Sequence, residues 1–200
     1  MEQIRSFIAI ELPDELKLEL TRLEARLKSS GQTWVKWVDP YSIHLTLKFL
    51  GSIPVDRVGE ITKGMEEAAR VVPPFRLEVR GLGVFPSLGR AQVAWVGVEG
   101  EVDKLGQLQQ GIESSLEPLG FTPEARPFTP HLTLARLRNQ ASSDERRSFG
   151  QLVVGTSFEA ARAIEVGAVS LMKSWLTREG AIYSRISSVR LNRLLSTPTA

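Results

Sequence analysis

The chain has 200 residues, of which 42% are apolar and 24% are charged, and its formal net charge is only +2. This length suits one compact domain or two small lobes, and the small charge excess, gathered as arginines in residues 121–200, is below that of a dedicated duplex-binding domain. The absence of cysteine excludes disulfides and thiolate metal sites, and no apolar run is long enough for a secretion signal or a membrane span, which predicts a cytoplasmic protein.

The first half of the chain alternates strand and helix signals. Residues 4–12 are rich in β-formers, and Pro13 then opens a helix whose apolar stripe runs to Leu27 and which Gly31 ends. Residues 34–38 and 43–50 are predicted as strands, the second ended by Gly51, and residues 55–70 are predicted as a helix.

The second half continues with the same kinds of element. Residues 75–82 and 91–98 form a strand pair around a turn-rich segment, and residues 102–119 have a helical pattern. The three prolines of residues 121–130 predict an extended loop before a strand over 131–137 and a short helix over 144–154. Strands over 157–171 and 181–189, with a turn at Gly180, complete the chain.

An internal repeat lies within this pattern. Residues 41–50 align with residues 128–137, and both segments contain His-Leu-Thr-Leu followed by a further shared leucine. Each copy follows a strand and a helix, so two similar units are expected around a pseudo-twofold axis. The predicted fold class is α+β: a single bilobal domain over residues 1–200, with two lobes of antiparallel sheet plus helices flanking a central groove.

The chain has two histidines, and both lie in this repeat. Side chains alternate between the faces of a strand, so His44 and Thr46 share one face while Ile43, Leu45, Leu47 and Phe49 take the face under the helices. His131 and Thr133 share a face in the same way. Two lobes meeting across a groove then present two imidazoles and two hydroxyls to one space.

These groups suit the opening of a cyclic phosphate. One histidine takes a proton from water, the other protonates the departing oxygen, and the hydroxyls of Thr46 and Thr133 meet the developing charge. Arg136 could hold two phosphate oxygens, but simple alternation gives it the parity of Leu132 and Leu134 and points it away from the groove. No metal or cofactor is expected, because two histidines without a carboxylate cluster make a poor metal site.

The paired motifs resemble those of the two-histidine (2H) phosphoesterases, and most closely the bacterial and archaeal RNA 2',3'-cyclic phosphodiesterases, historically named 2'-5' RNA ligases. Supporting similarities cover residues 5–10, Pro13, residues 81–86, residues 170–174, Gly180 and Tyr183. The resemblance implies metal-independent hydrolysis of a 2',3'-cyclic phosphate at an RNA 3' end to a 2'-phosphate. By position it makes His44, Thr46, His131 and Thr133 catalytic and Arg136 a phosphate contact. No obligatory protein partner and no membrane is implied.

Three alternatives remain open from the sequence. The same site could join RNA ends through a 2'-5' linkage, although no ATP-binding loop exists. The chain could bind RNA without turnover, or it could act on small cyclic nucleotides or 2'-5' oligoadenylate. For hydrolysis to a 2'-phosphate the departing atom is the 3' oxygen, and we assign His131 as the base toward water and His44 as the acid toward that oxygen.

Overall fold

The computed structural model describes residues 2–28, 33–177 and 181–192. Within these ranges four α-helices and nine strands follow one another along the chain, with short 3-10 turns between them. Their bounds are β1 Gln3–Glu11, α1 Asp14–Lys28, β2 Val35–Trp37, β3 His44–Pro54, α2 Val58–Ala69, β4 Phe75–Phe85, β5 Val93–Gly100, α3 Val102–Leu116, β6 His131–Leu137, α4 Ser143–Gly155, β7 Ile164–Val166, β8 Ala168–Leu176 and β9 Ala181–Arg190.

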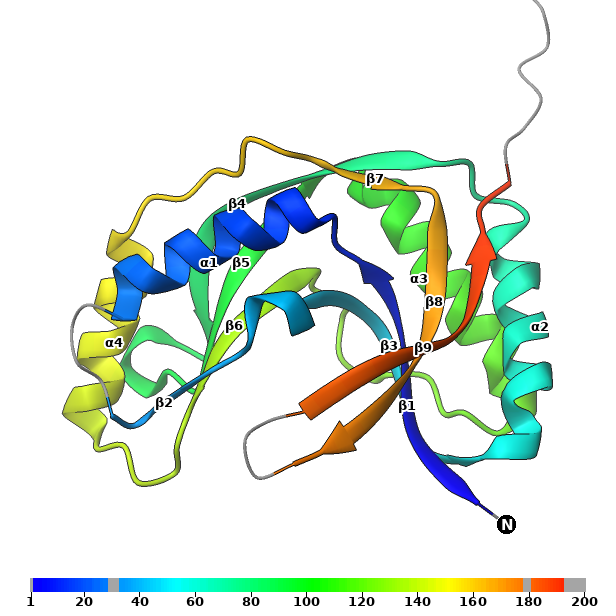
Figure 1. Cartoon of the computed structure of the whole chain (residues 1–200), viewed down its shortest axis with the longest axis horizontal. Coiled ribbons are helices and arrows are strands. Elements are labelled where there is room, and N and C mark those ends of the chain that lie inside the picture. The colour runs from blue at the N-terminus through cyan, green and yellow to red at the C-terminus, as the bar shows by residue number, and fades with distance from the viewer. Residues whose placement is uncertain (1, 29–32, 178–180, 193–200) are drawn as a thin grey trace, which may run out of the picture.

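The strands form one antiparallel sheet in the order β7-β4-β5-β6-β3-β1-β8-β9, with β2 also paired to β6. The sheet is curled, as Figure 1 shows. We call β3, β1, β8 and β9 the first lobe and β6, β5, β4 and β7 the second lobe. The two lobes meet at β3 and β6, where the register contains one pair, Leu45 and Leu132. The α+β prediction is confirmed, with the two lobes joined in one sheet.

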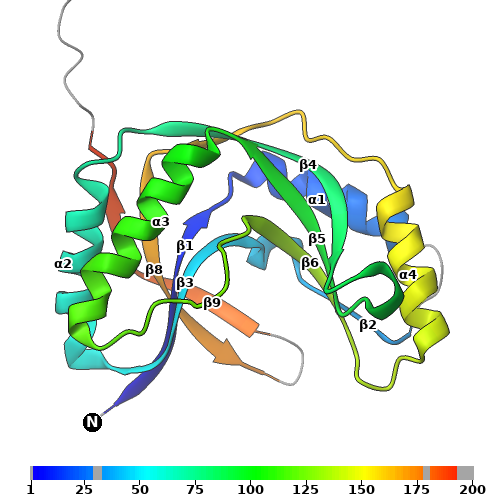
Figure 2. The ribbon, with the colours of Figure 1, turned by 180° about the vertical axis from the view of Figure 1, so that it is seen from behind.

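The helices cross between the lobes. Helix α3 follows β5 of the second lobe but packs with α2 against the first, where Gly111 and Gly64 allow close contact with Ala68 and Leu116. Helix α1 follows β1 of the first lobe but lies with α4 on the side of β4 and β5 (Figures 1 and 2). Because each β-α-β unit spans both lobes, neither unit packs as an isolated repeat.

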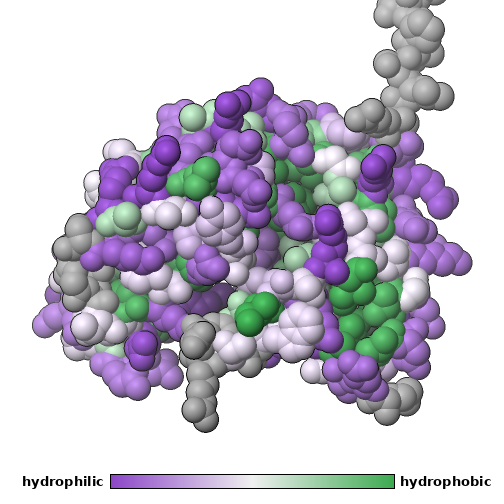
Figure 3. Space-filling model, viewed as in Figure 1, coloured by the Kyte–Doolittle hydropathy of each residue, from purple (hydrophilic) through white to green (hydrophobic). Residues whose placement is uncertain are grey.

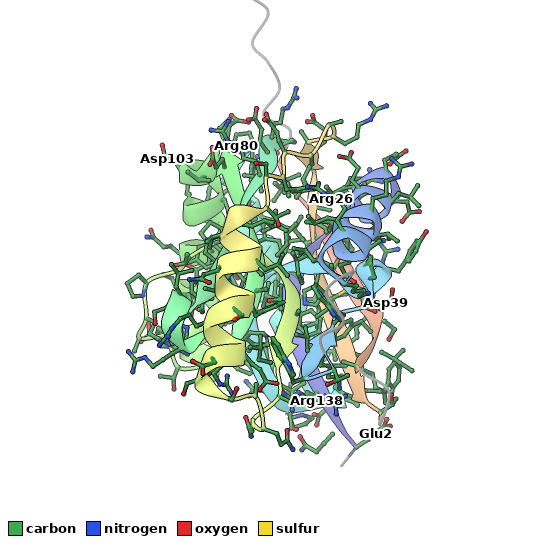
Figure 4. All side chains as sticks on the ribbon, turned by 90° about the vertical axis from the view of Figure 1, so that its left-hand side faces the viewer. Glu2, Arg26, Asp39, Arg80, Asp103 and Arg138 are labelled. Atoms are coloured by element: carbon green, nitrogen blue, oxygen red, sulfur yellow. The ribbon has the colours of Figure 1, made fainter. Side chains whose placement is uncertain are left out.

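The side view in Figure 4 shows α4 outermost on the second lobe, with Arg80 of β4 and Arg138 just after β6 at opposite ends of that lobe. The core lies between the sheet and the helices. The stripe of α1 predicted from the sequence, from Leu16 to Leu27, is buried there. None of the helices in the described residues combines the length and the apolar character that a membrane span requires.

Two details of the predicted elements were wrong. Strand β3 does not end at Gly51 but continues to Pro54, because Gly51 adopts φ +72° and bends the strand without ending it. The predicted strand over 157–171 is two shorter strands, β7 and β8, and residues 157–163 contribute only an isolated bridge from Glu159 to Arg80. The predicted helix stop at Gly31 and the turn at Gly180 lie outside the described residues.

Candidate active site

The paired histidine motifs meet at the junction of the two lobes. Leu45 and Leu132 are partners in the antiparallel register and both are fully buried, so their neighbours point to the opposite, open face. Alternation along each strand places His44 and Thr46 of β3, and His131 and Thr133 of β6, on that open face on either side of this pair. The structure therefore brings the four predicted residues onto one face of two adjacent strands.

Each histidine is the first residue of its strand and is held by the backbone just before it. His44 Nδ1 lies 2.9 Å from the carbonyl oxygen of Ser42, and His131 Nδ1 lies 2.7 Å from that of Thr129. A carbonyl oxygen only accepts hydrogen bonds, so each Nδ1 carries the hydrogen and donates it. This fixes the tautomer and leaves each Nε2 free to take or give a proton.

Aromatic rings orient both imidazoles. The His44 ring stacks on Phe7 with ring centroids 4.5 Å apart. It makes an edge-to-face contact with Tyr183, with ring centroids 4.9 Å apart. In the register His44 pairs with Glu11, so its ring reaches Phe7 by passing the small side chain of Ala9.

His131 has a different pair of rings around it. The centroid of its ring lies 5.1 Å from that of Phe85 and 6.5 Å from that of Trp95. Gly83 makes room for the indole, because a Cβ at this position would overlap the six-membered ring of Trp95. The glycine of the predicted turn-rich segment thus serves the packing beside His131.

Burial changes the proton affinity of His44. Burial lowers the pKa of His44 below its usual value, while the Ser42 carbonyl and the Glu11 carboxylate act in the opposite direction. Glu11 itself accepts a hydrogen bond from Ser170 Oγ at 2.6 Å and forms an ion pair with Arg185 at 3.4 Å. Burial also raises the pKa of Tyr183, so its phenol keeps its proton.

Arg136 does not follow simple alternation. The register between β5 and β6 shifts between Ala94 and Trp95, whose partners are Ala135 and Thr133. This β-bulge leaves Leu134 and Ala135 both buried and returns Arg136 to the face of Thr133. Arg136 is exposed and close enough to Tyr183 to oppose the rise of its pKa. The expectation that parity directs it away from the groove was therefore wrong.

The same irregularity occurs in the first motif, where it corrects another prediction. The register between β1 and β3 shifts between Ile8 and Ala9, whose partners are Lys48 and Thr46. Phe49 therefore does not pack under the helices: it is 69% exposed and lies 6.2 Å from Phe7 on the His44 side. Lys48 instead turns inward and pairs with Glu113 of α3.

The sequence predicted only a packing role for Phe49, yet the repeat contained a signal for its place beside His44. Phe49 follows His44 by five positions, as Arg136 follows His131, so the bulges place them at matching points.

The surface is hollowed beside the β8–β9 hairpin in the space-filling view (Figure 3). In the described residues no three His, Cys, Asp or Glu side chains gather as a metal-binding group would require.

Comparison with known proteins agrees with this internal duplication. The family model of the LigT-like phosphoesterases matches twice, over residues 10–95 and 96–183, and each match contains one histidine motif. The chain belongs to the LigT-like phosphoesterase family.

Curated relatives match the chain over nearly its whole length. A protein of Methanothermobacter thermautotrophicus named RNA 2',3'-cyclic phosphodiesterase is 32% identical over 94% of this chain and 100% of its own. One of the same name from Aeropyrum pernix is 34% identical over 86% of this chain and 94% of its own.

Solved structures of LigT-like proteins have the same fold. A crystal structure of a Thermus thermophilus protein has a TM-score of 0.76 at 29% identity, covering 94% of this chain and 98% of that one. E. coli LigT complexed with 3'-AMP has a TM-score of 0.74 at 23% identity, covering 96% and 100% of the two chains.

Proposed function

We propose that this LigT-like phosphoesterase hydrolyses the 2',3'-cyclic phosphate at an RNA 3' end to a 2'-phosphate, without a metal ion. The observation that carries the proposal is the placement of two histidines, each with a free Nε2, on one face at the junction of the lobes. The relatives named RNA 2',3'-cyclic phosphodiesterase support the substrate. Because the two motifs come from opposite lobes, residues 1–200 act as one unit. We place this unit in the cytoplasm.

The reaction needs a base and an acid on opposite sides of the phosphorus. His131 Nε2 takes a proton from water, the resulting hydroxide attacks phosphorus in line, and the bond from phosphorus to the 3' oxygen breaks. His44 Nε2 gives its proton to that 3' oxygen. The Glu11 carboxylate favours the imidazolium of His44, and burial makes that imidazolium a stronger proton donor, which together suit the acid role.

The remaining groups hold the substrate. The hydroxyls of Thr46 and Thr133 donate to the non-bridging phosphate oxygens, where charge builds up in the transition state. Arg136 has no hydrogen bond or ion pair within the described residues and can offer two N–H groups to the same oxygens. The exposed ring of Phe49 offers a stacking surface for the terminal base.

The test is an assay of end groups. An RNA with a 2',3'-cyclic phosphate is incubated with the protein in excess chelator, and we expect a 2'-phosphate product at the rate seen without chelator. Loss of turnover in chelator, restored by one divalent ion, would contradict the proposed chemistry. Adding an RNA with a 5'-hydroxyl end detects ligation, and binding without any product would assign the chain as an RNA-binding module.

A further inference from the structure

The face of the first lobe that carries His44 and Thr46 continues in rows of side chains that are partners across the strands. One row contains the catalytic Thr46, the next contains Phe49 and Phe7, and a third contains Arg5. The full rows, from β3 to β9, are Thr46–Ala9–Ser170–Ser188, Phe49–Phe7–Met172–Arg185 and Ser52–Arg5–Ser174–Tyr183. Arg5 thus shares the face of the catalytic residues and lies one step beyond Phe7.

Within the described residues, Arg5 differs from its basic neighbours in having no acidic partner. Lys173 of β8 lies 3.9 Å from Glu2, and Arg185 of β9 lies 3.4 Å from Glu11. Arg5 is exposed and makes no hydrogen bond or ion pair with any part of the chain that the structure describes. Its guanidinium is therefore available to an anion without first breaking a protein contact.

A second observation places this charge at the groove. Arg5 and Arg136 come from different lobes, yet both act on Tyr183. Burial raises the pKa of Tyr183, and the charges of both arginines lower it. Tyr183 also contacts His44 at 4.9 Å and Phe7 at 5.2 Å. Tyr183 therefore connects the catalytic histidine to two arginines, one beside each lobe's part of the site, that have no acidic partner among the described residues.

We propose that Arg5, flanked by Ser52 and Ser174, binds the phosphodiester group one nucleotide upstream of the cyclic phosphate. Arg5 lies four residues, about 13 Å of strand, from Ala9, which is the partner of Thr46, and Arg5 acts on Tyr183, whose ring contacts His44. This span accommodates the nucleotide between the reacting phosphate and the upstream phosphodiester. Arg136 then serves the reacting phosphate, and Arg5 serves the chain that leads to it. This inference rests on the proposed function and makes the substrate an oligonucleotide end rather than a cyclic mononucleotide.

The experiment compares two substrates that differ in that phosphodiester. Uridine 2',3'-cyclic phosphate has none, and the dinucleotide UpU with a 2',3'-cyclic phosphate has one. For Arg5→Ala we expect kcat/KM to fall about tenfold for the dinucleotide, the scale of one charge-assisted hydrogen-bonding contact, and less than about twofold for the mononucleotide. Arg5→Lys, which keeps the charge, is expected to retain part of the preference.

Lys173→Ala is the matched control. It removes a positive charge from the adjacent strand, at a position alternating with the Arg5 row, and is expected to leave the substrate ratio unchanged. Equal losses for both substrates in Arg5→Ala, or no loss for either, would overturn the upstream site. If the wild-type chain turned over neither substrate, the proposed function would have failed. Titration with UpU carrying a terminal 2'-phosphate would then test Arg5 by affinity, with unchanged affinity in Arg5→Ala counting against it.

Discussion

The motif on β3 and the motif on β6 share a backbone design but differ in two side chains near its end. Both start a strand with histidine, hold its Nδ1 on a carbonyl two residues earlier, and contain a bulge after the threonine. At the two positions after the shared leucine, the first copy has Lys48 and Phe49, and the second has Ala135 and Arg136. In the function that we propose, the duplicated frame supplies proton transfer, whereas the divergent pair supplies different contacts for base and phosphate.

The sharpest way to break this comparison is to remove either histidine. His44→Ala and His131→Ala are each expected to lower kcat by about 10²–10⁴, the usual range for an acid or base group. In a substrate with a bridging sulfur at the 3' position, the leaving group is a thiolate, which departs without being protonated. This substrate should therefore partly rescue His44→Ala and do nothing for His131→Ala. The rates of both variants on the oxygen and the sulfur substrate test the assignment of His44 as acid and His131 as base. Rescue of His131→Ala alone would show that the two assignments must be exchanged.

The sequence predicted the frame well because its signal was periodic. Alternation around His44 and around His131, together with the repeat, was enough to place four side chains on one face. The predicted alternation of side chains failed after Thr46 and after Thr133, where each strand contains a bulge. A bulge depends on pairing with β1 or β5 and has no signature within one strand.

The rings beside the histidines were not predicted as a set. Phe7 lies in a different strand from Tyr183, and both reach His44 through pairings distant along the chain. The helix exchange between the lobes was missed for the same reason, since local periodicity does not specify which part of the sheet a helix covers.

The second expected effect concerns the buried member of the divergent pair. Lys48 is 5% exposed and pairs with Glu113, while also donating to the carbonyl oxygen of Thr122 at 3.0 Å. Lys48→Ala restores the residue type of the second motif but leaves Glu113 without its cation. We expect the free energy of unfolding to fall by about 3–5 kcal/mol in urea denaturation.

Replacing both partners is the control for this prediction. The double variant Lys48→Met with Glu113→Leu removes the charges together, so it should recover most of the lost stability. A loss below about 1 kcal/mol in Lys48→Ala would show that the inward turn of Lys48 contributes little to holding the bulge.

A smaller effect separates the exposed members, Arg136 and Phe49. Arg136→Ala removes a donor to the phosphate and should lower kcat, with Arg136→Lys recovering only part because a lysine does not hold two oxygens in one plane. Phe49→Ala removes a stacking surface and should raise KM about tenfold with kcat nearly unchanged. Steady-state kinetics on one dinucleotide substrate distinguishes them, and the same kcat defect in both would contradict the division of roles.

The smallest expected effect concerns proton affinity. Burial disfavours the charged imidazolium, so the pKa of His44 lies below its usual value of 6.5. With two histidines in the chain, an NMR titration contains two sets of ring signals, and His131→Ala identifies the set that belongs to His44. The His44 midpoint is expected below pH 6.5, and Glu11→Gln should lower it further by removing the carboxylate that favours the imidazolium. Since His44 must be protonated to act as acid, that variant should also lose activity at a lower pH on the alkaline side of its profile. A His44 midpoint at or above 6.5, or one that Glu11→Gln raises, would show that burial does not control the acid in this lobe.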